Sequence, residues 1–263
     1  MRILTTTFLF LLNCVVFAQN GKSDVQVEYQ AFFNTDSPMK MFTTLYVNGN
    51  TAVYQEKYST REDWKEKAKP SNAPPGSVTT VSGGVADDDY YRIDPAKNEV
   101  LFYDDIMRNK FLIKDNPPAI QWKLTEDSKT ISGFQCMKAV GDFRGRQWIA
   151  WFAPEIASPF GPWKLQGLPG IILEAHDSTN KYTMKAIKVE YNKSDIITKD
   201  FTKIYETANT KPITYKQFLE DQKEAMDNAH NEIAQKMKAS GATITRHHVP
   251  RSGEELEFEW EKL

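Results

Sequence analysis

Cysteine is almost absent from this sequence. Only Cys14 and Cys136 occur in 263 residues, and Cys14 lies in an apolar segment that we expect to be removed. A chain left with Cys136 alone forms no internal disulfide, so a hydrophobic core must supply its stability. A domain of this length buries roughly 70–75% of the surface of its unfolded chain, which is enough for such a core.

An excess of charge of one sign is also lacking. The chain carries 33 Lys and Arg against 35 Asp and Glu, a formal net charge of −2. This balance creates no field that attracts nucleic acid or an anionic membrane surface, and no basic run alternates with aromatic residues. We therefore expect no nucleic-acid partner.

Hydrophobic runs long enough to span a membrane are missing as well. After Arg2, residues 3–17 carry no charge but are interrupted by polar residues, and polar residues 19–22 follow too early for a spanning helix of about 20 apolar residues. This pattern, ending in Ala18, predicts a signal peptide over residues 1–18 with cleavage near Ala18-Gln19. Lipidation at Cys14 is the alternative, which bulky Asn13 just before it disfavours. We expect a periplasmic or secreted protein that does not span the membrane.

Alternating side chains dominate what remains. Residues 25–31 place apolar side chains at every second position, and residues 42–47 and 51–56 flank the turn residues Asn48-Gly49-Asn50. The first pattern predicts a half-buried strand and the second a β-hairpin. Runs of the same kind recur at 90–93, 99–103, 111–114, 120–124, 137–143, 147–152, 170–175, 182–191 and 256–260. Strands at such short spacing predict a large antiparallel sheet.

One segment departs from this period. Between Thr214 and Ser240, apolar residues recur every three or four positions, Thr214 and Gln217 match a capping box, and Gly241 follows as a stop signal. We expect a long helix packed on the sheet, the alternative being a lid over an apolar cavity. The predicted fold class is therefore mainly β (α+β): a large curved antiparallel sheet, half-barrel-like, with one long helix near the C-terminus. By analogy it looks like the half-barrels of lipoprotein carriers.

Three spaced blocks carry a family resemblance. They are residues 133–139, 146–156 and 161–174, and the last contains Gly167-Leu168-Pro169-Gly170-Ile171-Ile172. In this order the blocks resemble the GLPGLI family, with one exchange among aliphatic residues in the hexapeptide that names it. The resemblance implies a periplasmic or secreted protein of two-membrane bacteria, of a family without an established activity. Because β-rich domains often run to about 200–250 residues, we expect residues 19–263 to form a single GLPGLI-type β-rich domain.

The corner at residues 161–170 has two interpretations. Gly161, Gly167 and Gly170 permit close approaches or unusual backbone angles, while Pro162 and Pro169 stiffen the chain between them, which predicts a rigid connection into the next strand. Nearby apolar side chains then either fill the core or form a wall that binds an apolar ligand. These candidate binding residues are Trp148, Trp151, Phe160, Trp163 and Leu168.

Convincing catalytic and metal sites are not found. His176 and Asp177 are adjacent, so in a strand they point to opposite faces and do not orient one another. His247-His248 lacks further ligands, and Asp87-Asp88-Asp89 lacks the spacing of a calcium loop. Cys136 is expected to be a buried, inert thiol, and Arg144 and Arg146 either bind an anion or pair across strands. We predict no catalytic residue, no metal and no cofactor.

The predicted function is a non-enzymatic periplasmic binding or envelope accessory protein. Its partner is an apolar small molecule such as a lipid, a peptide or an envelope protein, held at the aromatic face near Trp151 and Trp163. The alternatives are a hydrolase with a dispersed site, drawn from His176, Asp177 and Cys136, and a structural role in envelope assembly.

Overall fold

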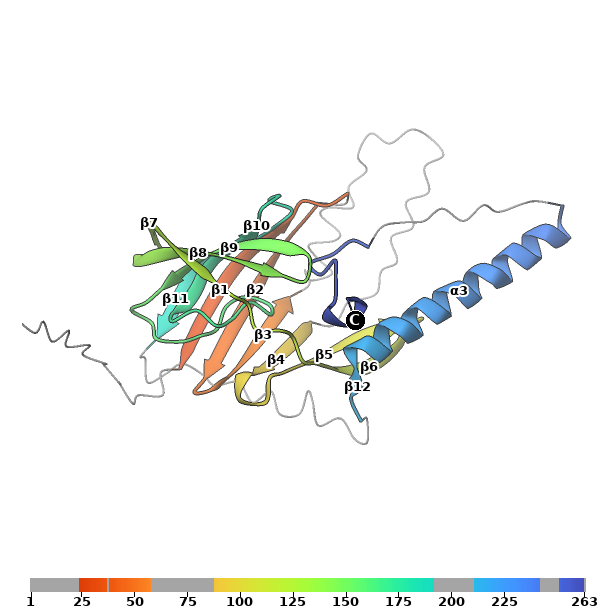
Figure 1. Cartoon of the computed structure of the whole chain (residues 1–263), viewed down its shortest axis with the longest axis horizontal. Helices are drawn as coiled ribbons and strands as arrows, with labels where there is room; N and C mark the ends of the chain where they lie inside the picture. The colour runs from red at the N-terminus through yellow and green to blue at the C-terminus, as the bar shows by residue number, and fades with distance from the viewer. Residues whose placement is uncertain (1–23, 37, 58–87, 192–210, 242–250, 263) are drawn as a thin grey trace, which may run out of the picture.

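The computed structural model describes residues 24–36, 38–57, 88–191, 211–241 and 251–262. These residues form one large open sheet of 12 strands with a single α-helix against it (Figure 1). The mainly β fold class with one long helix is confirmed. The predicted signal peptide lies outside the described residues. The strands are β1 (Val25–Phe33), β2 (Met39–Asn48), β3 (Thr51–Lys57), β4 (Asp89–Asp94), β5 (Glu99–Ile106), β6 (Asn109–Asp115), β7 (Lys123–Ile131), β8 (Phe134–Phe143), β9 (Arg146–Ala153), β10 (Ile171–Asp177), β11 (Tyr182–Tyr191) and β12 (Ile213–Thr214).

The strand order joins two meanders through the first strand. Across the sheet it runs β12-β6-β5-β4-β3-β2-β1-β11-β10-β9-β8-β7. Neighbouring strands are antiparallel, except that the short β12 runs parallel to β6, which makes the sheet mixed. Because β1 pairs with both β2 and β11, it connects the half of the sheet built from β2 to β6 and β12 to the half built from β7 to β11.

The core lies on the face to which alternate side chains point. Val25, Val27, Tyr29 and Ala31 of β1 are all 0% exposed, whereas the residues between them are partly exposed. The Tyr29 hydroxyl donates a hydrogen bond of 2.6 Å to the carbonyl oxygen of Ile172. The buried polar end of this side chain is thereby satisfied, as a buried hydroxyl requires.

The predicted hairpin and helix boundaries agree with the structure. β2 ends at Asn48, β3 begins at Thr51, and Gly49 adopts a φ of +57°, which a tight turn between paired strands needs. The helix α3 spans Tyr215–Ala239, and the Thr214 side chain accepts a hydrogen bond from the backbone N–H of Gln217. Only that half of the capping box forms, because the Gln217 amide donates to Asp221 at 2.7 Å.

Helix α3 meets the sheet with its first turns. It contacts β5, β6 and β12, and Phe218 is its one buried residue in the described structure. Further along, Met226 is 58% and Ile233 is 53% exposed, and Figure 1 shows this part of the helix running away from the sheet. No described helix combines the length and apolar character needed to cross a membrane.

Two predicted strands are wrong. Residues 256–260 form no strand: the backbone N–H groups of Leu256 and Glu257 both donate to the Arg144 carbonyl oxygen, and a 3₁₀ turn η2 spans Glu259–Glu261. The apolar alternation there reflects Phe258 stacking on Trp260, with ring centroids 4.6 Å apart.

The second error is the strand predicted at 120–124. The strand in this region is the polar β7, whose central residues 126–128 are exposed. The apolar residues that precede it cover the corner, since the Trp122 indole N–H donates to the Gln166 carbonyl oxygen at 2.8 Å.

Candidate functional site

The predicted aromatic wall lies largely inside the core. Trp148 is 0%, Phe160 1%, Trp163 4% and Leu168 2% exposed, and only Trp151 is partly exposed. The rings of Trp148 and Trp163 pack with centroids 5.8 Å apart. This burial favours the interpretation in which these side chains fill the core, and their binding role stays a prediction.

The corner at residues 161–170 is built as a close-packed turn. A Cβ on Gly170 would lie 2.3 Å from the Ala153 carbonyl oxygen, and Gly167 has a φ of +98°. The Gly167 N–H donates to the Pro159 carbonyl oxygen at 2.8 Å, and the Leu165 N–H donates to that of Pro162 at 3.2 Å. Glycine is therefore needed at two positions for geometric reasons. Gly161, Pro162 and Pro169 complete the same turn.

The three residues of the hydrolase alternative make local contacts; for His176, the ring Nδ1 lies 3.1 Å from the carbonyl oxygen of Asp177. The Asp177 carboxylate accepts from the Arg146 guanidinium at 3.0 Å and from the Tyr182 N–H at 2.9 Å, so its oxygens hold a turn in place. Burial raises the pKa of the Cys136 thiol to about 11. His247 and His248 lie outside the described residues.

A buried ionic cluster joins the C-terminal segment to the sheet. We use this name for Asp115, Arg144, Lys164, Tyr215 and Glu255. The Arg144 guanidinium contacts Asp115 through two bonds of 2.8 Å, and the Lys164 ammonium lies 2.8 Å from Asp115 and 3.0 Å from Glu255. For Arg144 and Arg146, the sequence predicted either an anion site or pairing across strands. Both guanidinium groups contact carboxylates, which favours ion pairing.

The electrostatics of this cluster indicate a structural role. Burial alone would disfavour the ionised form of Asp115, but the adjacent Lys164 and Arg144 hold its pKa below the usual value. Burial, followed by the charge of Glu255, raises the pKa of Tyr215, whose hydroxyl donates to that carboxylate at 3.0 Å. Because each charge has an opposite charge or a donor against it, the cluster holds residues 251–262 in a fixed place.

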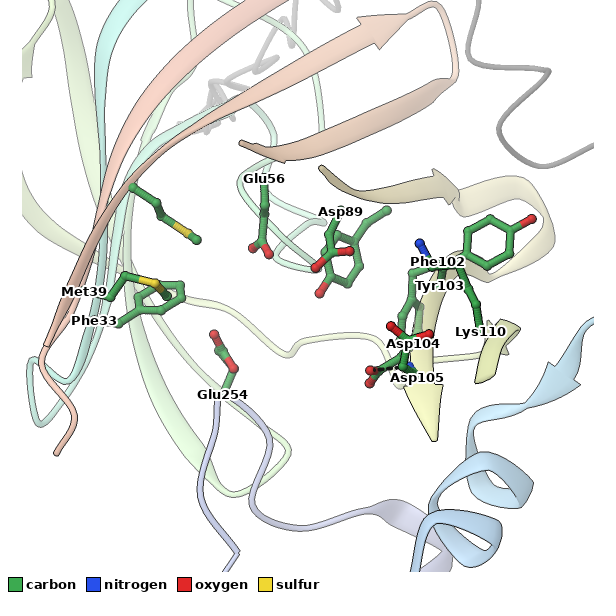
Figure 2. A pocket seen from close by; sticks show the side chains of 12 residues that line it. Phe33, Met39, Glu56, Asp89, Phe102, Tyr103, Asp104, Asp105, Lys110 and Glu254 are labelled. Carbon is green, nitrogen blue, oxygen red and sulfur yellow. Dashed lines mark hydrogen bonds between the residues drawn. The ribbon is translucent and has the colours of Figure 1, made fainter. Parts of the chain in front are cut away.

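Next to this cluster, the structure contains an acidic cavity of about 260 Å³. The ends of strands β1 to β6 and the C-terminal segment surround it, and Figure 2 shows the carboxylates of Glu56 and Glu254 directed toward one another from opposite sides. Its lining residues are Phe33, Met39, Met41, Glu56, Asp89, Tyr91, Phe102, Tyr103, Asp104, Asp105, Lys110 and Glu254.

Glu56 is the unusual side chain of the acidic cavity. It is only 8% exposed, and within the described residues its carboxylate has no hydrogen bond and no ion pair. Burial, followed by the negative charges of Glu254 and Asp89, raises its pKa from 4.5 to about 8. A buried carboxyl group without a partner costs free energy, so such groups concentrate at functional sites.

The ionic cluster fixes the opposite wall of the cavity. Glu255 belongs to the cluster, and its neighbour Glu254 lines the cavity, where burial and the charge of Glu255 raise its pKa. The Lys164 ammonium lies 4.7 Å from the ring centroid of Phe102, which also lines the cavity. The two features therefore share a wall, and the order of the cavity depends on the cluster.

Sequence reasoning missed this site. Asp89 was singled out only as part of an acidic run, and Glu56 and Glu254 lie almost two hundred residues apart in the chain. In the sheet, Glu56 on β3 pairs with Thr43 on β2 and with Asp89 on β4. The pairing of β3 with β4 brings the carboxyl groups of Glu56 and Asp89 together. The one signal present was Glu56 near the end of a strand that also contains the apolar residues Ala52, Val53 and Tyr54. No three His, Cys, Asp or Glu residues of the described chain are grouped so that they would hold a metal ion.

Neither the models of known protein families nor the curated proteins give a match to this sequence. The resemblance to the GLPGLI family therefore stays a prediction. Among solved structures, PNGF-II is similar in two crystal forms. In the C2 form the TM-score is 0.51 at 15% identity, covering 77% of this chain and 33% of PNGF-II. In the P2₁ form it is 0.52 at 15% identity, covering 78% and 34%.

The chain thus spans about one third of PNGF-II, and at this identity the likeness concerns the fold alone. A putative outer membrane lipoprotein-sorting protein domain from Vibrio parahaemolyticus is also similar, at 9% identity over 71% of this chain and 92% of that domain. Its TM-score is 0.26, so the analogy with lipoprotein carriers stays a prediction.

Proposed function

We propose that this chain is a non-enzymatic binding or accessory protein of the periplasm, and that its ligand occupies the acidic cavity. The observation that carries this proposal is Glu56, a carboxyl group that is 8% exposed and has no partner among the described residues. Burying such a group lowers the stability of the protein, and a ligand that pairs with the carboxyl group would offset this loss.

The shape of the site supports binding. Pockets that bind small molecules combine apolar and aromatic walls with a few polar groups that fix orientation. Here the surface that faces the cavity is mainly polar: Glu56 and Glu254 supply carboxyl groups on opposite walls, and the buried Phe33, Met41 and Phe102 also line it. The fixed position of Glu254 beside the ionic cluster means that the site is largely formed before a ligand enters.

The proposed location rests on the N-terminal pattern and on the family resemblance. The basic residue, the uncharged stretch and the small residue at Ala18 fit an export signal, and the GLPGLI-type blocks fit a periplasmic or secreted protein. We also propose that residues 19–263 act as one domain. The second candidate is an envelope protein or lipid at Trp151, which is the one partly exposed residue of the predicted aromatic wall; the Lys129 ammonium lies 4.2 Å from the centroid of its ring.

Native mass spectrometry of the chain isolated from periplasm tests the proposal. The informative variant is Met39→Trp, because Met39 lines the cavity and is 39% exposed, so a larger ring there narrows the site without displacing the core. The matched control is Met137→Trp, at a residue that is 38% exposed on β8 and does not line the cavity.

We expect the wild type and Met137→Trp to carry the same added mass, and Met39→Trp to lose most of it. An unliganded mass for the wild type contradicts the proposal. So does an added mass that all three proteins retain equally, because the ligand would then lie elsewhere.

A further inference from the structure

Among the described residues that line the acidic cavity, carboxyl groups strongly outnumber basic groups. Five carboxyl side chains line it against a single ammonium group, that of Lys110. Low-dielectric walls concentrate the field of the carboxylates that are ionised, and a cation also favours ionisation of the protonated ones, so the cavity favours a positively charged occupant. The five carboxyl groups belong to Glu56, Asp89, Asp104, Asp105 and Glu254.

The remaining walls suit an organic cation rather than a bare ion. The lining includes the aromatic side chains of Tyr91, Phe102 and Tyr103, and Figure 2 shows Phe33 and Met39 together on one side of the cavity. Ring faces attract ammonium and guanidinium groups, and thioether side chains adapt to irregular apolar chains. A metal ion would use none of this surface, and the described carboxylates are not grouped for metal binding.

The volume limits the size of the occupant. Cavities that enclose drug-sized ligands measure about 300–1,000 Å³, and this one measures about 260 Å³. It therefore holds a small molecule or one long side chain, but no folded segment.

We propose that the acidic cavity binds the ammonium or guanidinium group of a small organic cation or of one side chain, with Glu56 as its buried counter-charge. This inference rests on the proposed function and names its ligand chemistry. The same chemistry has two sources, a free amine and the Lys or Arg side chain of a peptide, which the experiment separates.

Proton linkage gives the proposal a second readout. Burial, followed by the facing carboxyl groups of Glu254 and Asp89, raises the pKa of Glu56 to about 8. At neutral pH most Glu56 side chains therefore hold a proton. The buried Tyr54 on the same strand is uncharged, because burial raises its pKa well above 10.0. A bound cation favours the ionised carboxylate, so Glu56 releases its proton to solvent when the cation enters. Affinity should therefore increase with pH by up to about tenfold per unit below pH 8.

Isothermal titration calorimetry with defined probes tests the inference. The free-amine probe is hexylammonium, the neutral and anionic controls are 1-hexanol and hexanoate, and the peptide probe is Gly-Lys-Gly with both ends blocked. Wild-type protein is compared with Glu56→Gln, which keeps the shape of the side chain, and with Glu126→Gln, which alters an exposed carboxylate on β7 outside the cavity.

We expect hexylammonium to bind at least tenfold more tightly than 1-hexanol at pH 8, and hexanoate to show no binding. Glu56→Gln should lower the affinity about tenfold and abolish its pH dependence between pH 6 and 8, whereas Glu126→Gln should bind as the wild type does. Tighter binding of the peptide than of hexylammonium assigns the site to a side chain, and the reverse assigns it to a free amine.

Equal affinity for hexylammonium and 1-hexanol, or an unchanged affinity in Glu56→Gln, overturns the inference. If those results accompany an added mass that Met39→Trp removes, the proposed function stands and only the ligand class is wrong. If the added mass is missing as well, both fail.

Discussion

Arg144 and Asp115 form a two-bond ion pair in which Nη1 and Nη2 each lie 2.8 Å from one carboxylate oxygen, and both side chains are 1% exposed. The pair joins the turn between β8 and β9 to the last residue of β6. Since these elements belong to opposite halves of the sheet, the pair holds the two halves against the C-terminal segment.

The first prediction concerns this pair. Replacing Arg144 with Gln leaves the carboxylates of Asp115 and Glu255 buried with one partner fewer, and breaking a buried pair in this way costs about 3–5 kcal/mol. We expect urea denaturation to show a loss of that size in the free energy of unfolding. Arg251→Gln is the control, because its pair with Glu261 is about 40% exposed on each side; its loss should stay below about 1 kcal/mol. Equal effects of the two changes would argue against the cluster as a structural element.

The second prediction is a stability that falls as the pH rises. The pKa of Glu56 is about 8 in the folded chain against an ordinary 4.5, so folding favours the protonated form. This contribution to the free energy of unfolding is fully present below pH 4.5 and is lost as the pH rises through 8. Each pKa unit corresponds to about 1.4 kcal/mol, so the contribution is at most about 5 kcal/mol. Melting temperatures between pH 5.5 and 9 should fall for the wild type and for Glu126→Gln.

Glu56→Gln should flatten that curve, because the amide carries no proton to lose. The variant should also be more stable than the wild type at pH 9, where the wild type buries a charged carboxylate. A wild-type curve that rises over this range would show that Glu56 ionises without cost, and the buried, unpartnered carboxyl group would then need another explanation.

The fold was predictable because its determinants are local. Alternation in residues 25–31, Gly49 in a two-residue turn and Thr214 at a helix start each depend on neighbouring residues alone. Strand β7 was missed for the same reason: it is an edge strand with exposed side chains, so it shows no apolar alternation.

The acidic cavity was not predictable because it depends on the order of strands and on one distant contact. Glu56 meets Asp89 only through the pairing of β3 with β4, and Glu254 reaches both only because Glu255 binds Arg144 and Lys164. Neither relationship leaves a mark in the spacing of residues along the chain. Trp148 and Trp163 were predicted as binding residues but are buried. An aromatic motif looks the same in sequence whether it fills a core or lines a site.

The third prediction separates crowding from backbone strain in the corner. Gly170→Ala places a Cβ 2.3 Å from the Ala153 carbonyl oxygen, so strand β10 or the end of β9 must shift; overpacking of this kind costs about 1–3 kcal/mol or more. Gly241→Ala is the control, because a Cβ there meets nothing within 4 Å although φ is +79°, and that strain costs about 1–2 kcal/mol. Chemical denaturation should show the larger loss for Gly170→Ala, and the opposite order would show that the corner yields easily.

The fourth prediction concerns the reactivity of Cys136 and bears on the hydrolase alternative. Burial raises the pKa of this thiol to about 11, so at pH 7 only about one molecule in ten thousand carries the reactive thiolate, against a few per cent for an ordinary cysteine. In a Cys14→Ser background, iodoacetamide should therefore label the folded chain about two orders of magnitude more slowly than the chain unfolded in urea. A catalytic thiol would behave in the opposite way, because catalysis requires a thiolate in the folded state. Rapid labelling of the folded protein would restore Cys136 as a nucleophile, and labelling only after unfolding would assign it to the core beside β7 and β9.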